Sequence, residues 1–115
     1  MRKVNKITSD YHQEFVFPFS FGDVILKLYY SDNMVGWFFS ITYKDFKLEN
    51  ASLVNHPNLL NQFNLILPFG LTCVTKNGID AVSRFDFEDG MAELYFLDEQ
   101  EVNYVANFEL RRVDD

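Results

Sequence analysis

Residues 11–30 have the sequence YHQEFVFPFSFGDVILKLYY, and its pattern predicts the first two strands of the fold. The odd positions up to residue 21 are aromatic, with Gln13 as the exception. From residue 24 to residue 30 every even position is apolar, and Ile25, Lys27 and Tyr29 lie on the opposite face. Such alternation is typical of strands, because successive side chains point to opposite faces of a sheet. The change of parity at Gly22-Asp23 predicts a turn, so the second strand folds back on the first. Pro18 cannot donate a backbone hydrogen bond, which predicts a strand that lies at a sheet edge or is broken in two.

The alternation continues after a turn predicted over residues 31–36. In the third strand one face is shared by Trp37, Phe39, Ile41 and Tyr43. This parity makes Trp37 a predicted anchor of the core. Lys44-Asp45 predicts a tight turn, and residues 46–49 alternate again as a fourth, short strand. Four strands joined by short turns predict an antiparallel meander.

The alternation fails between Asn50 and Asn64. Pro57 follows Asn55 and His56 in this segment, and proline is favoured at the first position of a helix. We therefore expect one short helical turn, or an irregular loop, near residues 57–63.

Period two returns from Leu65 to Cys73, where the odd positions are apolar. Asn77-Gly78 is a strong hairpin signal, so residues 79–87 are expected to run back as a strand. Asp89-Gly90 predicts a further turn into a strand over residues 91–97. A last strand is expected over residues 102–110, followed by a frayed tail from residue 110 to residue 115.

Together these elements predict an all-β fold, a small antiparallel β-barrel or sandwich. The chain has 115 residues, which is enough for one hydrophobic core and too few for two domains. We expect an N-terminal arm over residues 1–10, a single β domain over residues 11–110 and a C-terminal tail over residues 111–115.

The charge of the chain argues against several partners. Ten Lys and Arg residues stand against 17 Asp and Glu residues, giving a net charge of −7, which does not attract DNA or anionic lipid. No apolar run approaches the roughly 18 residues of a membrane helix. The lone Cys73 and an opening without an apolar signal core favour a protein made in a reducing cytoplasm. We expect neither specific nucleic-acid binding nor membrane association.

Residue types that carry catalysis are sparse. His12 and His56 have no nucleophile motif near them, and a Cys73/His56 pair is less expected than a buried, inert cysteine on a strand. One thiol without a closely spaced histidine pair argues against zinc. We expect no enzyme and no cofactor.

Three carboxylates precede Gly90, at Asp86, Glu88 and Asp89. They resemble a calcium-binding loop only faintly, because the ligand spacing of such loops is missing. A solvated hairpin tip is the better interpretation.

The first two strands carry apolar residues on both faces. Because a domain this small cannot bury both faces of its sheets, part of this surface is expected to contact another chain. Scattered surface hydrophobicity is the ordinary alternative. The residues predicted for this protein interface are Phe15, Val16, Phe17, Ile25 and Tyr29.

Several segments, taken in order, carry a resemblance to a known family. They are EFVFPF (14–19), VILKLYY (24–30), GWFFSI (36–41), SLV (52–54), NLL (58–60), FGLTCV (69–74) and AELYFL (92–97). This order resembles that of the small β domains known as baseplate plug proteins of contractile-tailed phages. The resemblance covers about residues 14 to 99.

The resemblance implies a structural virion protein of the inner baseplate, made in the host cytoplasm. It would lie near the tail tube end, the central hub or spike and the tape measure protein, be oligomeric in the particle, and act by being held in place and then displaced. The acidic residues between 86 and 101 suit a DNA conduit, because like charge keeps passing phosphates from adhering. Asp86, Glu88 and Asp89 are therefore expected to face the channel or solvent.

Two other classes remain open on the sequence. One is a small phage or bacterial protein that binds and inhibits a host target. The other is a β-barrel that binds a small apolar ligand.

Overall fold

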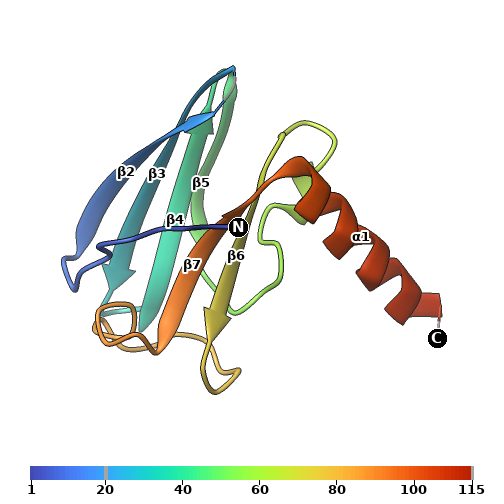
Figure 1. The fold of residues 1–115 in the computed structure, drawn as a ribbon. Helices are drawn as coiled ribbons and strands as arrows, with labels where there is room; N and C mark the ends of the chain where they lie inside the picture. The colour runs from blue at the N-terminus through green and yellow to red at the C-terminus, as the bar shows by residue number, and fades with distance from the viewer. Residues whose placement is uncertain (20, 115) are drawn as a thin grey trace.

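The computed structural model describes residues 1–19 and 21–114, and side chains up to residue 107. Two antiparallel sheets face each other, and a helix follows the last strand (Figure 1). The strands are β1 (Arg2–Lys3), β2 (His12–Phe19), β3 (Gly22–Ser31), β4 (Gly36–Tyr43), β5 (Phe46–Ser52), β6 (Gly70–Thr75) and β7 (Ala92–Leu97). The helices are the 3-10 turn η1 (Asn61–Phe63) and α1 (Glu99–Asp114).

The larger sheet is the predicted meander. Its strand order is β2-β3-β4-β5, so each strand pairs with its neighbour in sequence. Phe15 lies opposite Leu26, which lies opposite Ile41, so apolar side chains of three strands share one face of the sheet. β2 is an edge strand, as Pro18 predicts.

The smaller sheet has the order β1-β7-β6. β6 and β7 pair along their full length, from Gly70 opposite Leu97 to Thr75 opposite Ala92. β1 is only two residues long, and the Val4 amide extends its pairing by donating to the Leu94 carbonyl at 2.8 Å. This sheet is therefore narrower than the one it faces.

The core lies between the two sheets and is rich in aromatic rings. Trp37, Phe39, Phe69 and Phe96 are all buried. The Phe69 and Phe96 rings meet edge to face at 5.8 Å, a favourable arrangement of ring quadrupoles. The described residues thus form a sandwich-like fold rather than a closed barrel, and side chains fill the space where a barrel would hold a ligand. The predicted role of Trp37 as a core anchor is confirmed.

The strand predicted over residues 79–87 is wrong. Residues 76–91 form a long irregular loop, and β6 pairs instead with β7. Two carboxylates of this loop accept backbone hydrogen bonds. Asp86 accepts from the amides of Val82 and Ser83 within the loop, and Asp80 accepts from the amide of Asn55 outside it. Such side-chain hydrogen bonds compete with a strand ladder.

The segment before β6 agrees with the prediction in part. The helical turn η1 falls in the predicted range of residues 57–63. The strand expected from Leu65 begins only at Gly70, and Leu65 itself is 98% exposed. Leu67 and Phe69 are buried. The alternating pattern therefore predicts these two core residues correctly, although they form no strand.

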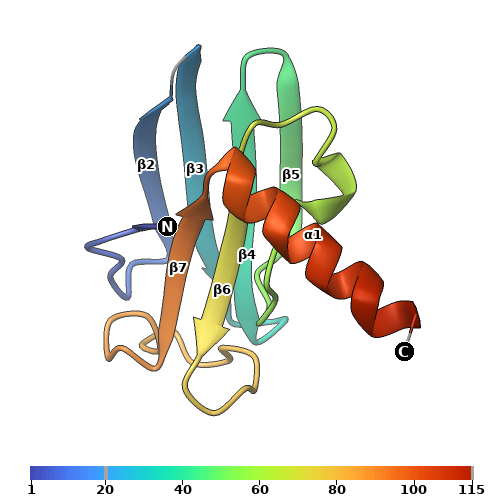
Figure 2. The same cartoon turned by 45° about the vertical axis from the view of Figure 1, so that its right-hand side comes forward.

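The strand predicted over residues 102–110 is also wrong, because those residues belong to α1. Asp98 and Glu101 exchange reciprocal hydrogen bonds, the Asp98 amide to the Glu101 carboxylate and the Glu101 amide to the Asp98 carboxylate. This capping box starts a helix where a strand was expected. Figure 2 shows α1 leading from the end of β7 past β6 and away from the sheets. Val102, in the first turns of α1, is buried.

α1 runs across residue 110, the predicted end of the β domain. The division into arm, domain and tail stays a prediction, and residue 115 of the tail lies outside the described residues. No helix in the described part of the chain is long and apolar enough to cross a membrane.

Candidate protein interface

The five residues predicted for the interface lie on two different faces of the four-stranded sheet. Phe15 and Phe17 lie opposite Leu26 and Val24, which are buried, so both rings point between the sheets. Val16 lies opposite Ile25, on the outer face of the four-stranded sheet. Tyr29 shares that face because its position has the parity of Ile25. The structure therefore brings three of the five residues together on one surface.

Phe15 and Phe17 are half-buried and pack against the core. The Phe17 ring lies 4.7 Å from that of Phe96, and the Arg2 guanidinium lies 5.7 Å from the centre of the Phe17 ring. They remain partly exposed at the β2 edge, where the narrow opposite sheet ends.

Val16, Ile25, Tyr29 and Phe38 supply the apolar side chains of the outer face, and we call this set the outer-face patch. Val16 is 57% exposed. The Tyr29 and Phe38 rings stack at 5.4 Å with an angle of 16° between their planes. Phe38 was missed on the sequence, although its position in the third strand has the parity opposite to Trp37 and so predicts an outward side chain.

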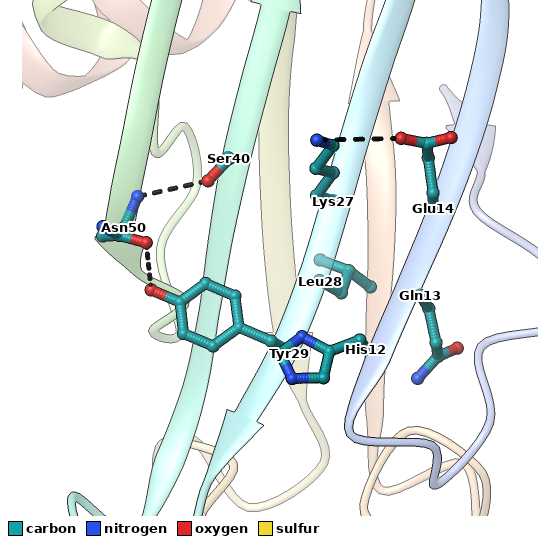
Figure 3. Close-up of a pocket in the computed structure, with 8 residues that line it drawn as sticks. All are labelled: His12, Gln13, Glu14, Lys27, Leu28, Tyr29, Ser40 and Asn50. Carbon is teal, nitrogen blue, oxygen red and sulfur yellow. Dashed lines mark hydrogen bonds and ion pairs between the residues drawn. The ribbon is translucent and has the colours of Figure 1, made fainter.

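An open groove lies beside this patch (Figure 3). It has a volume of about 550 Å³ and is lined by His12, Gln13, Glu14, Lys27, Leu28, Tyr29, Ser40 and Asn50. The Tyr29 hydroxyl donates to the Asn50 side-chain oxygen at 2.6 Å, and partial burial raises the pKa of Tyr29. Lys27 and Glu14 form an ion pair at 3.9 Å across β2 and β3. The lining of the groove thus includes both apolar and polar side chains, and the opposite charges of Glu14 and Lys27 cancel.

The three carboxylates predicted to face the channel or solvent have different surroundings. Asp86 is half-buried and holds the loop of residues 76–91 through the amides of Val82 and Ser83, at 3.1 and 3.0 Å. Glu88 is exposed and accepts from the Ser9 amide at 2.9 Å. Asp89 is exposed at the same end of the molecule. Asp86 is therefore a structural residue of the loop, and the other two carboxylates lie at its surface.

The same loop is fixed to the N-terminal arm and to the core. The Arg84 guanidinium donates to the Ser9 carbonyl at 2.8 Å and lies 4.7 Å from the centre of the Tyr11 ring. The Trp37 indole donates to the Ser83 carbonyl at 3.2 Å. These contacts fix the position of the loop of residues 76–91, although it forms no strand pairing.

Cys73 and His56 lie opposite each other, but as a backbone bridge. Cys73 is buried, as predicted, and burial raises the pKa of its thiol to about 12. Because a thiol with this pKa stays protonated at neutral pH, the pair does not supply an activated nucleophile. Among the described residues, no group of three or more His, Cys, Asp and Glu side chains is placed to hold a metal ion.

Comparison with known proteins identifies the family. A family model described as "Cyanophage baseplate Pam3 plug gp18" matches residues 1–99 of the chain. No curated protein matches. The resemblance to baseplate plug proteins is thereby confirmed, and the match ends where α1 begins. Because the match covers residues 1–99 of 115, this chain belongs to the family of the cyanophage baseplate plug.

Proposed function

We propose that this protein is a structural component of a phage tail baseplate, a plug that lies near the tail tube end and the hub. The observation that carries the proposal is the family match over residues 1–99. In this proposal the protein acts only through contacts with tube, hub or spike, and tape measure proteins, and it is displaced when the tail opens. It is made in the host cytoplasm and ends in the virion.

The outer-face patch supports a role in protein contacts. A sheet face that carries Val16, Ile25, Tyr29 and Phe38 leaves apolar area in water unless another surface covers it. A few central residues supply most of the free energy of an interface, and tyrosine is enriched among them. We propose that this patch is the main contact with a neighbouring baseplate protein.

The distribution of charge supports an orientation in the particle. The patch and its groove carry Glu14 with Lys27, whereas loop 76–91 carries exposed Glu88 and Asp89. Burying unpaired carboxylates in a dry interface is costly, so the acidic end is expected to remain in water or face the channel. There, its negative charge would repel DNA phosphates.

Complementation of a phage that lacks the gene tests this assignment of surfaces. Ile25→Glu places a charge in the patch beside Val16 and should reduce incorporation into particles at least tenfold. The paired control is Glu88→Gln with Asp89→Asn, which should assemble like the parent. Circular dichroism of each purified variant establishes that it is folded. Normal incorporation of folded Ile25→Glu, or loss of the control, would overturn the assignment.

A further inference from the structure

One edge of the four-stranded sheet has backbone groups without partners among the described residues. In the β2–β3 ladder the Tyr30 amide donates to the Tyr11 carbonyl at 2.9 Å. Because bonded and non-bonded positions alternate along an antiparallel strand, the odd residues of β2 bond to β3. The amides and carbonyls of His12, Glu14 and Val16 therefore point away from β3, toward the open side.

The far end of this edge is blocked. Pro18 has no amide hydrogen, and its carbonyl accepts from the Arg2 guanidinium at 3.3 Å. Both features are devices that hinder edge-to-edge pairing. Residues 12–16 lack such a block, since their free backbone groups make no hydrogen bond with any described side chain or loop. The open edge is thus a short segment, long enough for a specific pairing.

Apolar side chains lie on both faces of the sheet at the Val16 end of the open edge. Phe15 and Phe17 are half-buried on the inner side, and Val16 is exposed on the outer side with Ile25 beside it. The alternating side chains of a strand added here would reach both faces and cover both sets. This explains how inward and outward residues of β2 can serve one contact.

The charge near the edge is balanced. Glu14 is paired with Lys27, and Arg2 lies at the blocked end, where its guanidinium donates to the Pro18 carbonyl. Much of the excess negative charge of the chain lies instead on loop 76–91 and the start of α1. Two copies that meet at β2 therefore place no unbalanced charge against each other there.

We infer that β2 pairs antiparallel with β2 of a second copy of this chain, about a two-fold axis beside Phe15. In this register Phe15 faces its symmetry mate on the inner side, and Glu14 lies opposite Val16 of the other copy, so the two Glu14 carboxylates are not directly opposed. The two four-stranded sheets become one continuous sheet. The inference deepens the proposed function, because it specifies how copies of the plug associate.

Sedimentation velocity of the purified full chain over a range of concentrations tests the inference. The wild-type protein should form dimers at rising concentration. Val16→Pro removes one open-edge amide hydrogen and keeps an apolar side chain, and it should weaken dimerisation at least tenfold. Lys47→Pro is the matched control, because the parity of the β4–β5 ladder points the Lys47 amide out of the opposite edge of the same sheet. It should dimerise like the wild type.

Hydrogen exchange of the wild-type protein gives an independent result if Val16→Pro does not fold. The Glu14 and Val16 amides should exchange more slowly as dimers form, whereas exchange of the Lys47 amide should stay unchanged. A wild-type protein that remains monomeric, or dimers in which the Glu14 and Val16 amides stay unprotected, would overturn the inference. Presence of the protein in virions decides the proposed function separately, so the two failures are distinguishable.

Discussion

Trp37 lies where β4, β3 and the loop of residues 76–91 meet. Its ring is 2% exposed and meets Phe87 edge to face at 5.3 Å, and its indole donates to the Ser83 carbonyl. Trp37→Ala should lower the free energy of unfolding by about 3–5 kcal/mol, since it opens a cavity and removes that hydrogen bond. Urea denaturation measures the loss. Leu65→Ala, at a residue that is 98% exposed, is the control and should unfold like the parent.

Gly70 is a second residue whose surroundings fix its identity. A Cβ atom there would lie 2.7 Å from the Asn58 side-chain oxygen. That oxygen accepts from the amides of Leu60 and Leu71, at 3.0 and 3.1 Å, and Asn58 is buried. Gly70→Ala should therefore destabilise the protein by about 1–3 kcal/mol in thermal or urea unfolding. Gly36→Ala, where the nearest atom is 4.0 Å away, should cause no comparable loss, and equal effects would contradict this explanation.

The buried thiol of Cys73 makes stability depend on pH in alkaline solution. Its pKa is about 12 in the folded protein against an ordinary value of 9.0. Above pH 9 the unfolded chain loses this proton while the folded chain keeps it, so the free energy of unfolding falls as pH rises toward 12. The Cys73 contribution should decrease by about 1.4 kcal/mol per pH unit in that window. The free energies of unfolding of the wild type and of Cys73→Ala, measured by urea denaturation, should converge from pH 8 to pH 10.5. A difference that stays constant over this range would refute the assignment.

At the level of the elements, α1 depends on its first turn. Asp98 and Glu101 form the capping box, and Val102 is the buried contact of the helix in its first turns. Asp98→Ala should destabilise the helix by about 0.5–2 kcal/mol and reduce the far-ultraviolet signal at the helical minimum. Asp98→Asn retains a good capping side chain and is the control. A spectrum unchanged by Asp98→Ala would show that α1 does not depend on this cap.

The elements also show what the sequence could and could not predict. The meander of β2 to β5 followed from period-two aromatic residues, because each strand has one buried face and its parity is visible. The helix could have been recognised from Asp98 and Glu101, three residues apart before Val102. Loop 76–91 could not, because the Asp80 bond to the Asn55 amide joins distant segments of the chain. The interface prediction named residues of both parities, and only pairing with β3 separates Phe15 and Phe17 from Val16.

At the level of the whole molecule, the outer-face patch and the exposed carboxylates of loop 76–91 lie apart, and the loop also exposes Ile79, Val82 and Phe85. The outer-face patch lies on the large sheet, whereas exposed Glu88 and Asp89 lie on the loop between β6 and β7. A protein held by one surface while another faces water or DNA needs this separation, because packing the carboxylates into a contact would desolvate them. This separation links the fold to the proposed place in the baseplate.

Quantitative mass spectrometry of purified, washed phage particles from the source of this sequence tests whether the protein is a component of the virion. If the protein is a baseplate plug, its peptides should remain with the particles through washing, at a fixed ratio to the tail tube protein and far below it in copy number. Complete loss of the protein from washed particles, with the tail tube protein retained, would contradict the account and favour a protein that acts on a host target instead.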